Sequence, residues 1–232
     1  MRAVRVEPPS ELGTRNGLAY ALFLPPGESR GGVVMVHGAG SQKENQFDMA
    51  RALRAAGTAA VCFDQRGHGE SEGALGADAL DDIAAIATLL PSGPVGLRGS
   101  SMGGFMALMA STRMDVAAVV AICPATGELL ARGLRAGRFS FRADHDGLQA
   151  LLAQADEQAA ARALGERLLL MHAEGDESVP ISVSRELQAN APGSRLVAVP
   201  GGHHRSIQHD PELTAVAVRF LTRALRPRPG AG

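Results

Sequence analysis

The sequence predicts an α/β fold in which a mainly parallel sheet is covered by helices on both faces. Two observations indicate it. Short β-rich segments alternate with helical patterns along most of the chain, as in proteins built from parallel strands and covering helices. Several of these segments are continuously apolar and lack the polar alternation of a half-exposed strand, so both of their faces should be buried. The clearest central strands are residues 33–36, 59–63, 116–122 and 168–171.

Four further segments complete an expected sheet of eight strands. Residues 95–97 and 196–199 are short β-rich runs. Near the start, residues 4–6 and 18–24 are separated by the turn-rich stretch 13–17. We expect this pair to form an antiparallel hairpin at one edge of the sheet.

Two helices are specified by both their periodicity and their starts. Asp78 is placed to cap a helix in which apolar residues recur at helical spacing up to Leu90. The last helix has Asp210 as its cap and Pro211 at its first position, where a missing N–H costs nothing.

The length of 232 residues and an apolar content of 45% predict a single domain, 1–232, with a sizeable core. Residues 125–167 are the least regular part and predict an insertion over the sheet that could act as a short lid. It contains a helical stretch at 148–164 and four arginines, which we interpret as a solvated face: Arg132, Arg135, Arg138 and Arg142. Residues 226–232 are rich in proline and glycine and predict a frayed tail.

Charge and composition exclude several partners. A net charge of −1 provides no field that would recruit nucleic acid, and no apolar run approaches the length of a membrane span. We therefore expect a soluble, cytoplasmic protein. Cys62 and Cys123 both lie in apolar runs, where a thiol packs as a small hydrophobic group, so no disulfide is expected.

The strongest chemical signal is a Gly-x-Ser-x-Gly pattern, Gly99 to Gly103, between a strand and a helix that starts at Met102. A catalytic serine must protrude from a sharp strand-to-helix turn, and such a turn leaves no room for side chains two positions before and after it. Ser101 meets this requirement, whereas Ser100 has Arg98 and Met102 at those positions. Ser101 is the predicted nucleophile.

Other segments of the chain occur in the order in which a known family has them. They are 36–40 (Val-His-Gly-Ala-Gly), 64–71 (Asp-Gln-Arg-Gly-His-Gly-Glu-Ser), and the loops after the strands at 168–171 and 196–199. With them the chain resembles the α/β-hydrolase superfamily, in particular its small serine esterases and monoacylglycerol lipases, over nearly its whole length. The resemblance implies the α/β-hydrolase fold, with a mostly parallel eight-stranded sheet.

The resemblance also implies roles for individual residues. The backbone N–H groups of Ala39 and Met102 would form the oxyanion hole, which stabilises the charge that develops on the carbonyl oxygen by roughly 3 kcal/mol per donor. His37 would brace its loop rather than react. Arg66, His68 and Ser71 would tie down a loop near the pocket.

The same resemblance places the acid and the base in the last two loops. Asp176 matches the acid position, with Glu174 and Glu177 as alternatives, and would hold the imidazole in the required tautomer. The pattern Pro-Gly-x-x-His selects His204 as base, with the adjacent His203 as alternative. The chain order serine, aspartate, histidine is that of this fold.

No metal or cofactor is expected. A metal site built from His37, Asp64 and His68 has none of the known zinc spacings, and no phosphate-binding loop is present. We expect hydrolysis of carboxylic esters or thioesters with small or short acyl groups through an acyl-enzyme on Ser101. The alternatives are a serine peptidase or amidase with the same residues, and a non-catalytic binding or scaffold protein of the same fold.

Overall fold

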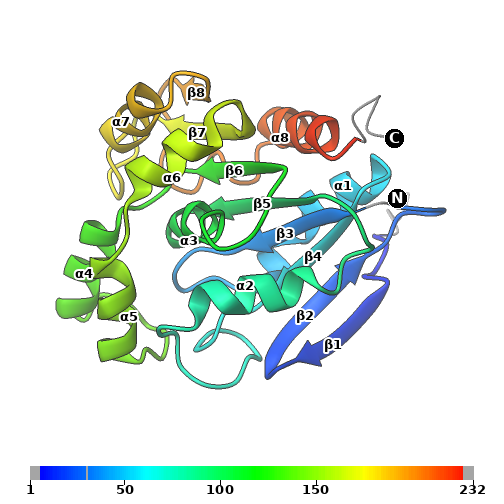
Figure 1. The fold of residues 1–232 in the computed structure, drawn as a ribbon, viewed down its shortest axis with the longest axis horizontal. Coiled ribbons are helices and arrows are strands. Elements are labelled where there is room, and N and C mark those ends of the chain that lie inside the picture. Colours follow the sequence, from blue (N-terminus) through cyan, green and yellow to red (C-terminus); the bar gives the residue numbers. More distant parts are fainter. Residues whose placement is uncertain (1–5, 30, 227–232) are drawn as a thin grey trace, which may run out of the picture.

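The computed structural model describes residues 6–29 and 31–226, and within them eight strands form one sheet in the order β1-β2-β4-β3-β5-β6-β7-β8 (Figure 1). β1 pairs antiparallel with β2, and β2 with β4, while all other neighbours are parallel. The prediction of a mainly parallel, eight-stranded sheet is therefore confirmed. The strands are β1 (Glu11–Arg15), β2 (Leu18–Phe23), β3 (Gly32–Val36), β4 (Ala59–Phe63), β5 (Val95–Ser100), β6 (Ala118–Ile122), β7 (Leu168–Ala173) and β8 (Arg195–Val199).

The edge hairpin was predicted with the wrong first strand. β1 is Glu11–Arg15, joined to β2 by Asn16 and Gly17, which both have positive φ (53° and 77°) as a two-residue hairpin turn requires. Val6 belongs to no strand and is 59% exposed, and residues 4–5 lie outside the described residues. The reason is that β1 lies at the edge with mostly exposed side chains, so its sequence carries no apolar pattern.

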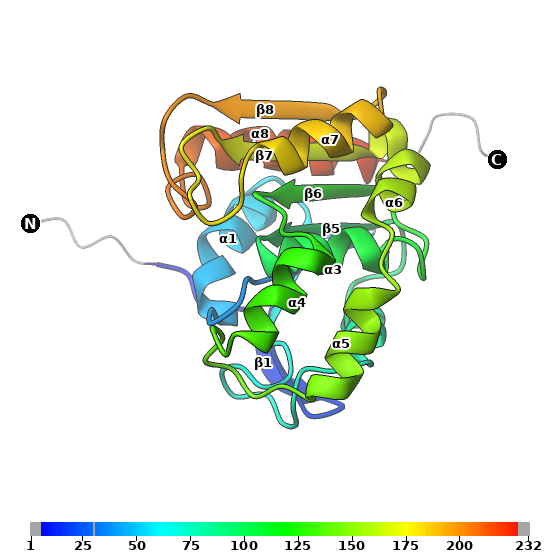
Figure 2. The same ribbon diagram turned by 90° about the vertical axis from the view of Figure 1, so that its left-hand side faces the viewer.

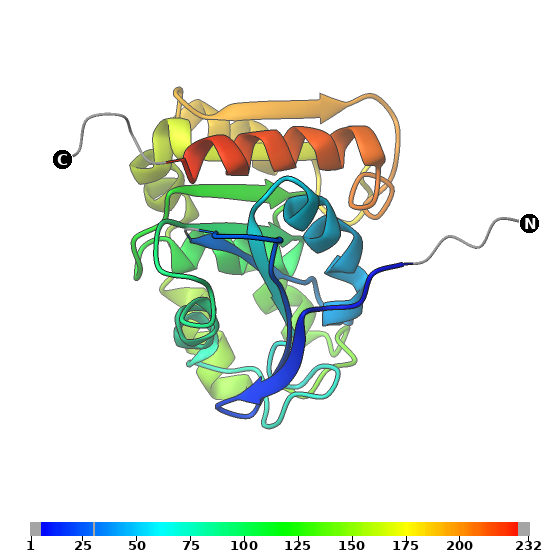
Figure 3. The ribbon, with the colours of Figure 1, turned by 90° about the vertical axis from the view of Figure 1, so that its right-hand side faces the viewer.

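Helices cover both faces of the sheet. α1 (Phe47–Ala55), which follows the short 3-10 helix η1 (Lys43–Gln46), packs on one face with α8 (Pro211–Ala224), as Figure 3 shows. The other face is covered by α2 (Ala79–Ala87), α3 (Met102–Ala110), α6 (Glu157–Leu164) and α7 (Ser182–Asn190) (Figure 2). None of the helices in the described part is both long and apolar enough to cross a membrane.

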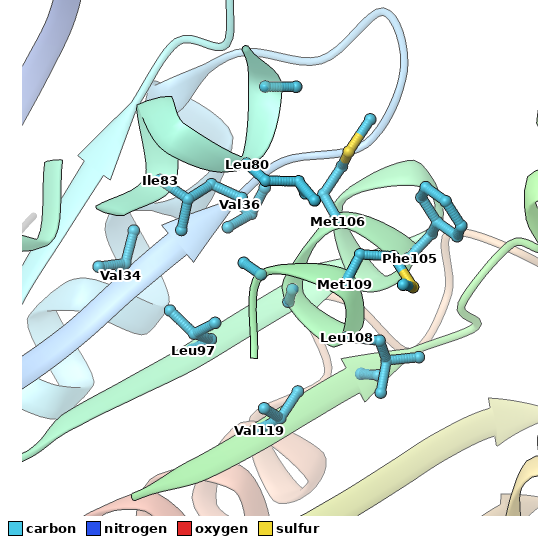
Figure 4. Packing of buried hydrophobic residues seen from close by; sticks show 14 of the residues in the cluster. Val34, Val36, Leu80, Ile83, Leu97, Phe105, Met106, Leu108, Met109 and Val119 are labelled. Carbon is cyan, nitrogen blue, oxygen red and sulfur yellow. The ribbon is translucent and has the colours of Figure 1, made fainter. Parts of the chain in front are cut away.

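The central strands alternate between these two layers. In β3, Val34 and Val36 contribute to the layer of α2 and α3, whereas Val33 and Met35 contribute to the layer of α1 and α8. Every residue of α3 is buried, and Figure 4 shows its apolar side chains packed among those of α2 and the neighbouring strands. The helix that follows Ser101 is thus fixed on all sides.

The insertion predicted at 125–167 contains three helices rather than one helical stretch. α4 (Gly127–Arg135) and α5 (His145–Ala153) stand outside α3, and a break at 154–156 separates α5 from α6 (Figure 2). Asp156 ends the break by accepting a hydrogen bond from the N–H of Ala159 (2.8 Å), so it caps α6. A further 3-10 helix, η2 (Gly165–Arg167), leads into β7. Of the predicted tail 226–232, all but Arg226 lies outside the described residues.

The two predicted caps differ in the structure. Asp210 accepts hydrogen bonds from the N–H groups of Glu212 (2.9 Å) and Leu213 (3.0 Å), as predicted. Asp78 precedes α2, but its side chain makes no capping hydrogen bond because its backbone (φ −82°, ψ 1°) is outside the extended conformation that N-cap residues adopt.

We predict that Asp210→Ala lowers the free energy of unfolding by about 1 kcal/mol, since two N–H groups lose their acceptor. Asp78→Ala is the matched control and should change it by less than about 0.5 kcal/mol. Urea unfolding followed by circular dichroism measures both. Equal losses in the two variants would contradict this assignment of the caps.

Candidate active site

Ser101 stands at a strained turn between β5 and α3. Its backbone is left-handed (φ 55°, ψ −121°), which is uncommon for a residue with a side chain. The turn is held by hydrogen bonds from the Ser101 N–H to the Ile122 carbonyl (2.9 Å) and from the Ala125 N–H to the Ser101 carbonyl (3.1 Å). The side chain is therefore lifted above the carboxyl ends of β5 and β6 and is partly exposed.

The two glycines of the motif are required by backbone contacts. A Cβ at Gly99 would lie 2.0 Å from the Gly103 carbonyl oxygen, and a Cβ at Gly103 would lie 2.1 Å from that of Val36. Atoms cannot approach so closely, and the neighbours are backbone that cannot move aside. The absence of side chains at these two positions is what allows the turn.

The loop after β3 passes directly beside the serine. A Cβ at Gly38 would lie 3.3 Å from the Ser101 Cβ, so the segment 37–40 borders the hydroxyl. Among the described residues, neither the Ala39 N–H nor the Met102 N–H donates a hydrogen bond to a protein group. Met102 is the first residue of α3, where N–H groups have no partner within the helix. One unpaired donor therefore follows Ser101 directly in the chain, and a second follows Gly38, which lies beside the serine.

Asp176 and His204 form a hydrogen-bonded pair. The loop after β7 carries Asp176, and the loop after β8 carries His204, whose Nδ1 donates to Asp176 Oδ2 at 2.7 Å. The aspartate side chain is fully buried and the imidazole is 18% exposed. With Nδ1 bound to the carboxylate, the Nε2 atom is left to act as an acceptor.

Several donors stabilise the charge of the buried Asp176. Burial raises the pKa of this carboxyl, but hydrogen bonds from the Val179 N–H, the His204 imidazole and the Cys123 thiol, together with the charge of the His204 ring, outweigh it, so the net pKa is lowered. The N–H groups of Ser178 and Val179 both donate to Oδ1 at 2.9 Å. His172, buried beneath, donates from Nε2 to the Val179 carbonyl (2.9 Å) and so supports the loop.

The alternatives to these residues lie elsewhere. His203 is exposed and its carbonyl and N–H bond to Ser206. Glu174 forms a surface ion pair with Arg185 (3.1 Å), and Glu177 is exposed. Only His204 of the two histidines bonds to Asp176 in the described structure.

No hydrogen bond joins the Ser101 hydroxyl to His204 within the described residues. In the absence of substrate such contacts are often long and shorten only when the substrate binds. The structure thus brings Ser101, the two free amides and the aspartate–histidine pair to the carboxyl edge of the sheet, where β3, β5, β7 and β8 end.

His37 supports the loop beside Ser101. It is buried, its Nδ1–H donates to the Gly38 carbonyl (2.8 Å), and its Nε2 accepts from the Gln65 N–H (3.0 Å). Both ring nitrogens are therefore engaged with backbone. Burial lowers the pKa of His37 to about 4, so the ring is neutral at pH 7.

The loop at 64–71 links the sheet to the insertion. Arg66 makes two hydrogen bonds with Asp82 (2.8 and 3.0 Å), and the Ser71 hydroxyl donates to the Asp64 carbonyl. The His68 ring stacks on Phe141 of the insertion, with ring centroids 4.4 Å apart. The insertion is thereby attached next to the 37–40 segment, although its function as a lid stays a prediction.

The arginines of the insertion do not gather into a site. Arg132 pairs with Glu128 on the surface of α4 (2.9 Å). Arg135 lines a groove of about 490 Å³ between α4 and the ends of α5 and α6, which also carries Glu128 and Glu157 and does not include Ser101 or His204. This mixed charge gives no anion-binding surface.

One cluster of three groups that could ligate a metal was found among the described residues: Cys123, Asp176 and His204. Burial raises the pKa of the Cys123 thiol, and a protonated thiol is a poor ligand. Asp176 and His204 already bond to each other. The donor set therefore fits an acid–base pair better than a metal.

Sequence reasoning missed Lys43 and Arg98, two buried basic residues near the site. Lys43, the only lysine of the chain, bonds to Asp64 (2.9 Å) and Glu70. Its uniqueness was a usable signal.

Comparisons with known proteins agree with this architecture. A family model described as serine aminopeptidase, S33, matches residues 27–131. No curated protein matches the chain in sequence. Among solved structures, a monoacylglycerol lipase of Paleococcus ferrophilus is similar with a TM-score of 0.69 at 24% identity, covering 89% of this chain and 99% of the other.

Two further structures are similar over most of their lengths. Est1E of Butyrivibrio proteoclasticus, solved with ferulic acid bound, has a TM-score of 0.74 at 19% identity and covers 93% of this chain and 99% of its own. A putative non-heme bromoperoxidase, BpoC of Mycobacterium tuberculosis, has a TM-score of 0.70 at 19% identity, covering 92% and 98%. The chain therefore has the α/β-hydrolase fold that its sequence predicts.

We predict that His37 makes stability fall in mildly acidic solution. Between its ordinary pKa of 6.5 and about 4, the unfolded chain binds a proton at this ring while the folded protein does not. The free energy of unfolding should therefore decrease from pH 6.5 towards pH 4, by on the order of 3 kcal/mol from this residue alone. Urea unfolding at several pH values measures the slope.

His37→Gln should make this slope shallower, whereas replacement of the exposed His145 by glutamine serves as control and should leave it unchanged. Lost packing would lower the free energy of unfolding by the same amount at every pH, whereas the lost proton linkage changes its slope with pH. Comparing the slopes of the variants therefore separates the two effects. Identical slopes in wild type and His37→Gln would show that the ring is not held neutral.

Proposed function

Given the α/β-hydrolase fold, we propose that the protein is a serine hydrolase that cleaves carboxylic esters or thioesters of small or short-chain acyl groups. The proposal depends above all on one observation: a serine in a left-handed turn, flanked by two unpaired N–H groups, lies at the same sheet edge as a buried aspartate–histidine pair. This set supplies a nucleophile, an oxyanion site and a base.

The reaction would proceed in two steps. His204 Nε2 takes the proton of the Ser101 hydroxyl while Oγ forms a bond to the carbonyl carbon, and the oxyanion accepts hydrogen bonds from the Ala39 and Met102 N–H groups. The tetrahedral intermediate then breaks its bond to the leaving alcohol or thiol, which takes the proton from His204. Water, deprotonated by the same imidazole, releases the acid and restores Ser101.

Asp176 would act through His204. Its carboxylate accepts the Nδ1–H, which fixes the tautomer with Nε2 free and stabilises the imidazolium that forms on proton transfer. The lowered pKa of Asp176 supports this role because it keeps the carboxylate ionised at neutral pH.

The small insertion supports a small acyl group. Its helices α4 and α5 stand beside the sheet edge rather than forming a second domain, and the segment carrying Phe139 and Phe141 is attached at His68. A small-molecule ester or thioester is therefore the expected partner, with no cofactor.

A peptidase is the second candidate, since the matching family model is described as serine aminopeptidase. Amide and ester hydrolysis use the same residues. Hydrolysis of aminoacyl p-nitroanilides distinguishes the two. Each enzymatic rate is divided by the uncatalysed rate of the same substrate, and an aminopeptidase would then show a larger acceleration for the anilides than for the corresponding p-nitrophenyl esters. A non-catalytic scaffold would hydrolyse neither.

We predict that the wild type hydrolyses p-nitrophenyl esters with a preference for short acyl chains. Ser101→Ala and His204→Ala should each lower kcat/KM on the order of 10⁴-fold or more, since each removes a group that acts in the transition state.

The adjacent histidine provides the matched control. His203→Ala should retain activity within about threefold, because its side chain makes no contact with Asp176 in the described structure. Equal losses in His203→Ala and His204→Ala, or full activity in Ser101→Ala, would contradict the proposed mechanism.

A further inference from the structure

Arg98 is a buried cation for which the proposed reaction has no role. It lies on β5, three residues before Ser101, and is 2% exposed. No carboxylate among the described residues lies within ion-pair distance of its guanidinium. Burial lowers its pKa to about 10, so it remains charged at neutral pH. A buried cation without a counter-ion is costly, and this arrangement requires an explanation.

The partners of Arg98 are neutral oxygens on two different elements. One terminal nitrogen donates to the side-chain oxygen of the buried Gln46, at the end of η1, and the other donates to the main-chain oxygen of Gln208 (3.2 Å). The Nε atom has no partner. The gap beside it, lined among others by Met49 and Ile207, has no room for a water molecule.

Gln208 connects this cation to the histidine loop. Its side-chain amide donates to the His204 carbonyl at 3.0 Å, while its own carbonyl accepts from Arg98. Two hydrogen bonds thus lead from the strand that carries Ser101 to the backbone of His204. The loop also has a buried apolar residue, Ile207, but among the described residues no other side chain from the central strands bonds to the 203–209 segment.

We propose that Arg98 is a positioning residue which, through Gln208, holds the His204 loop in register with the strand that presents Ser101. The inference rests on the proposed function. Its physical basis is that Ser101 follows the central strand β5, whereas His204 follows the edge strand β8. The two residues share no hydrogen bond in this structure, so their relative position depends on the contacts between the segments that carry them. A guanidinium suits the task because its planar fork reaches two elements at once.

The first test measures the loop without using activity. Hydrogen–deuterium exchange of the peptide 203–209 is compared in wild type, Arg98→Met and Gln208→Met, after thermal unfolding has shown which variants are folded. Both variants should exchange at least about tenfold faster in this peptide. Arg98→Met keeps nearly the same volume and removes the donors. Gln208→Met removes only the second hydrogen bond, on a half-exposed side chain.

The second test measures the consequence for catalysis. In p-nitrophenyl ester hydrolysis, both variants should lose about 10- to 100-fold in kcat with KM within about threefold, since misplacing the base affects the transition state rather than ground-state binding. Arg98→Lys keeps the charge without the fork and should fall between wild type and Arg98→Met.

Arg167→Met is the matched control. Arg167 also donates to two backbone carbonyls, those of Val116 (2.8 Å) and Ala163 (3.0 Å). It directly precedes the amino end of β7, whereas the candidate site lies at the carboxyl ends of the strands. It should leave both readouts unchanged. Wild-type exchange and kcat in Arg98→Met and Gln208→Met would overturn the proposal. A wild type without turnover would overturn the proposed function instead. Faster exchange of the peptide 203–209 in the two variants would still show that Arg98 holds the His204 loop.

Discussion

The structure of the candidate site depends on one steric constraint, the close approach of β5, α3 and the end of β3 around Ser101. The carbonyl oxygens of Gly103 and Val36 occupy the space that side chains at positions 99 and 103 would need. The backbone can turn from strand to helix within one residue only because both positions are glycine. The burial of α3 on all sides holds the strained conformation in place. The exposed hydroxyl and the unpaired Met102 N–H are both consequences of this turn.

A second requirement is electrostatic. Asp176 is fully buried, yet its carboxylate is kept charged by the N–H groups of Ser178 and Val179 and by the His204 ring. Two of these donors belong to the loop after β7, which carries Asp176, and the third belongs to the loop after β8. The hydrogen bonds to the carboxylate therefore connect the two loops. Arg98 is likewise a buried charged group that connects two segments, β5 and the His204 loop, but its partners are neutral oxygens and not a counter-ion.

The sequence predicted those parts of the molecule whose residues carry their own constraint. Buried parallel strands are continuously apolar, and the glycines around Ser101 are demanded by backbone contacts. The sequence does not predict the edge strand β1 because its exposed residues need no apolar pattern. It wrongly predicts a capping side chain at Asp78 because composition does not reveal backbone angles. The choice between adjacent histidines and the bonds of Arg98 depend on contacts between distant segments, which only the three-dimensional arrangement brings together.

The most direct test of the central claim is covalent labelling of the folded protein with a fluorophosphonate, followed by mass spectrometry of its peptides. Such a reagent reacts with a serine only where a base and an oxyanion site activate it. The account predicts a single adduct on Ser101, formed rapidly in wild type and at least about a thousandfold more slowly in His204→Ala. No adduct, or an adduct on Ser100, would contradict it.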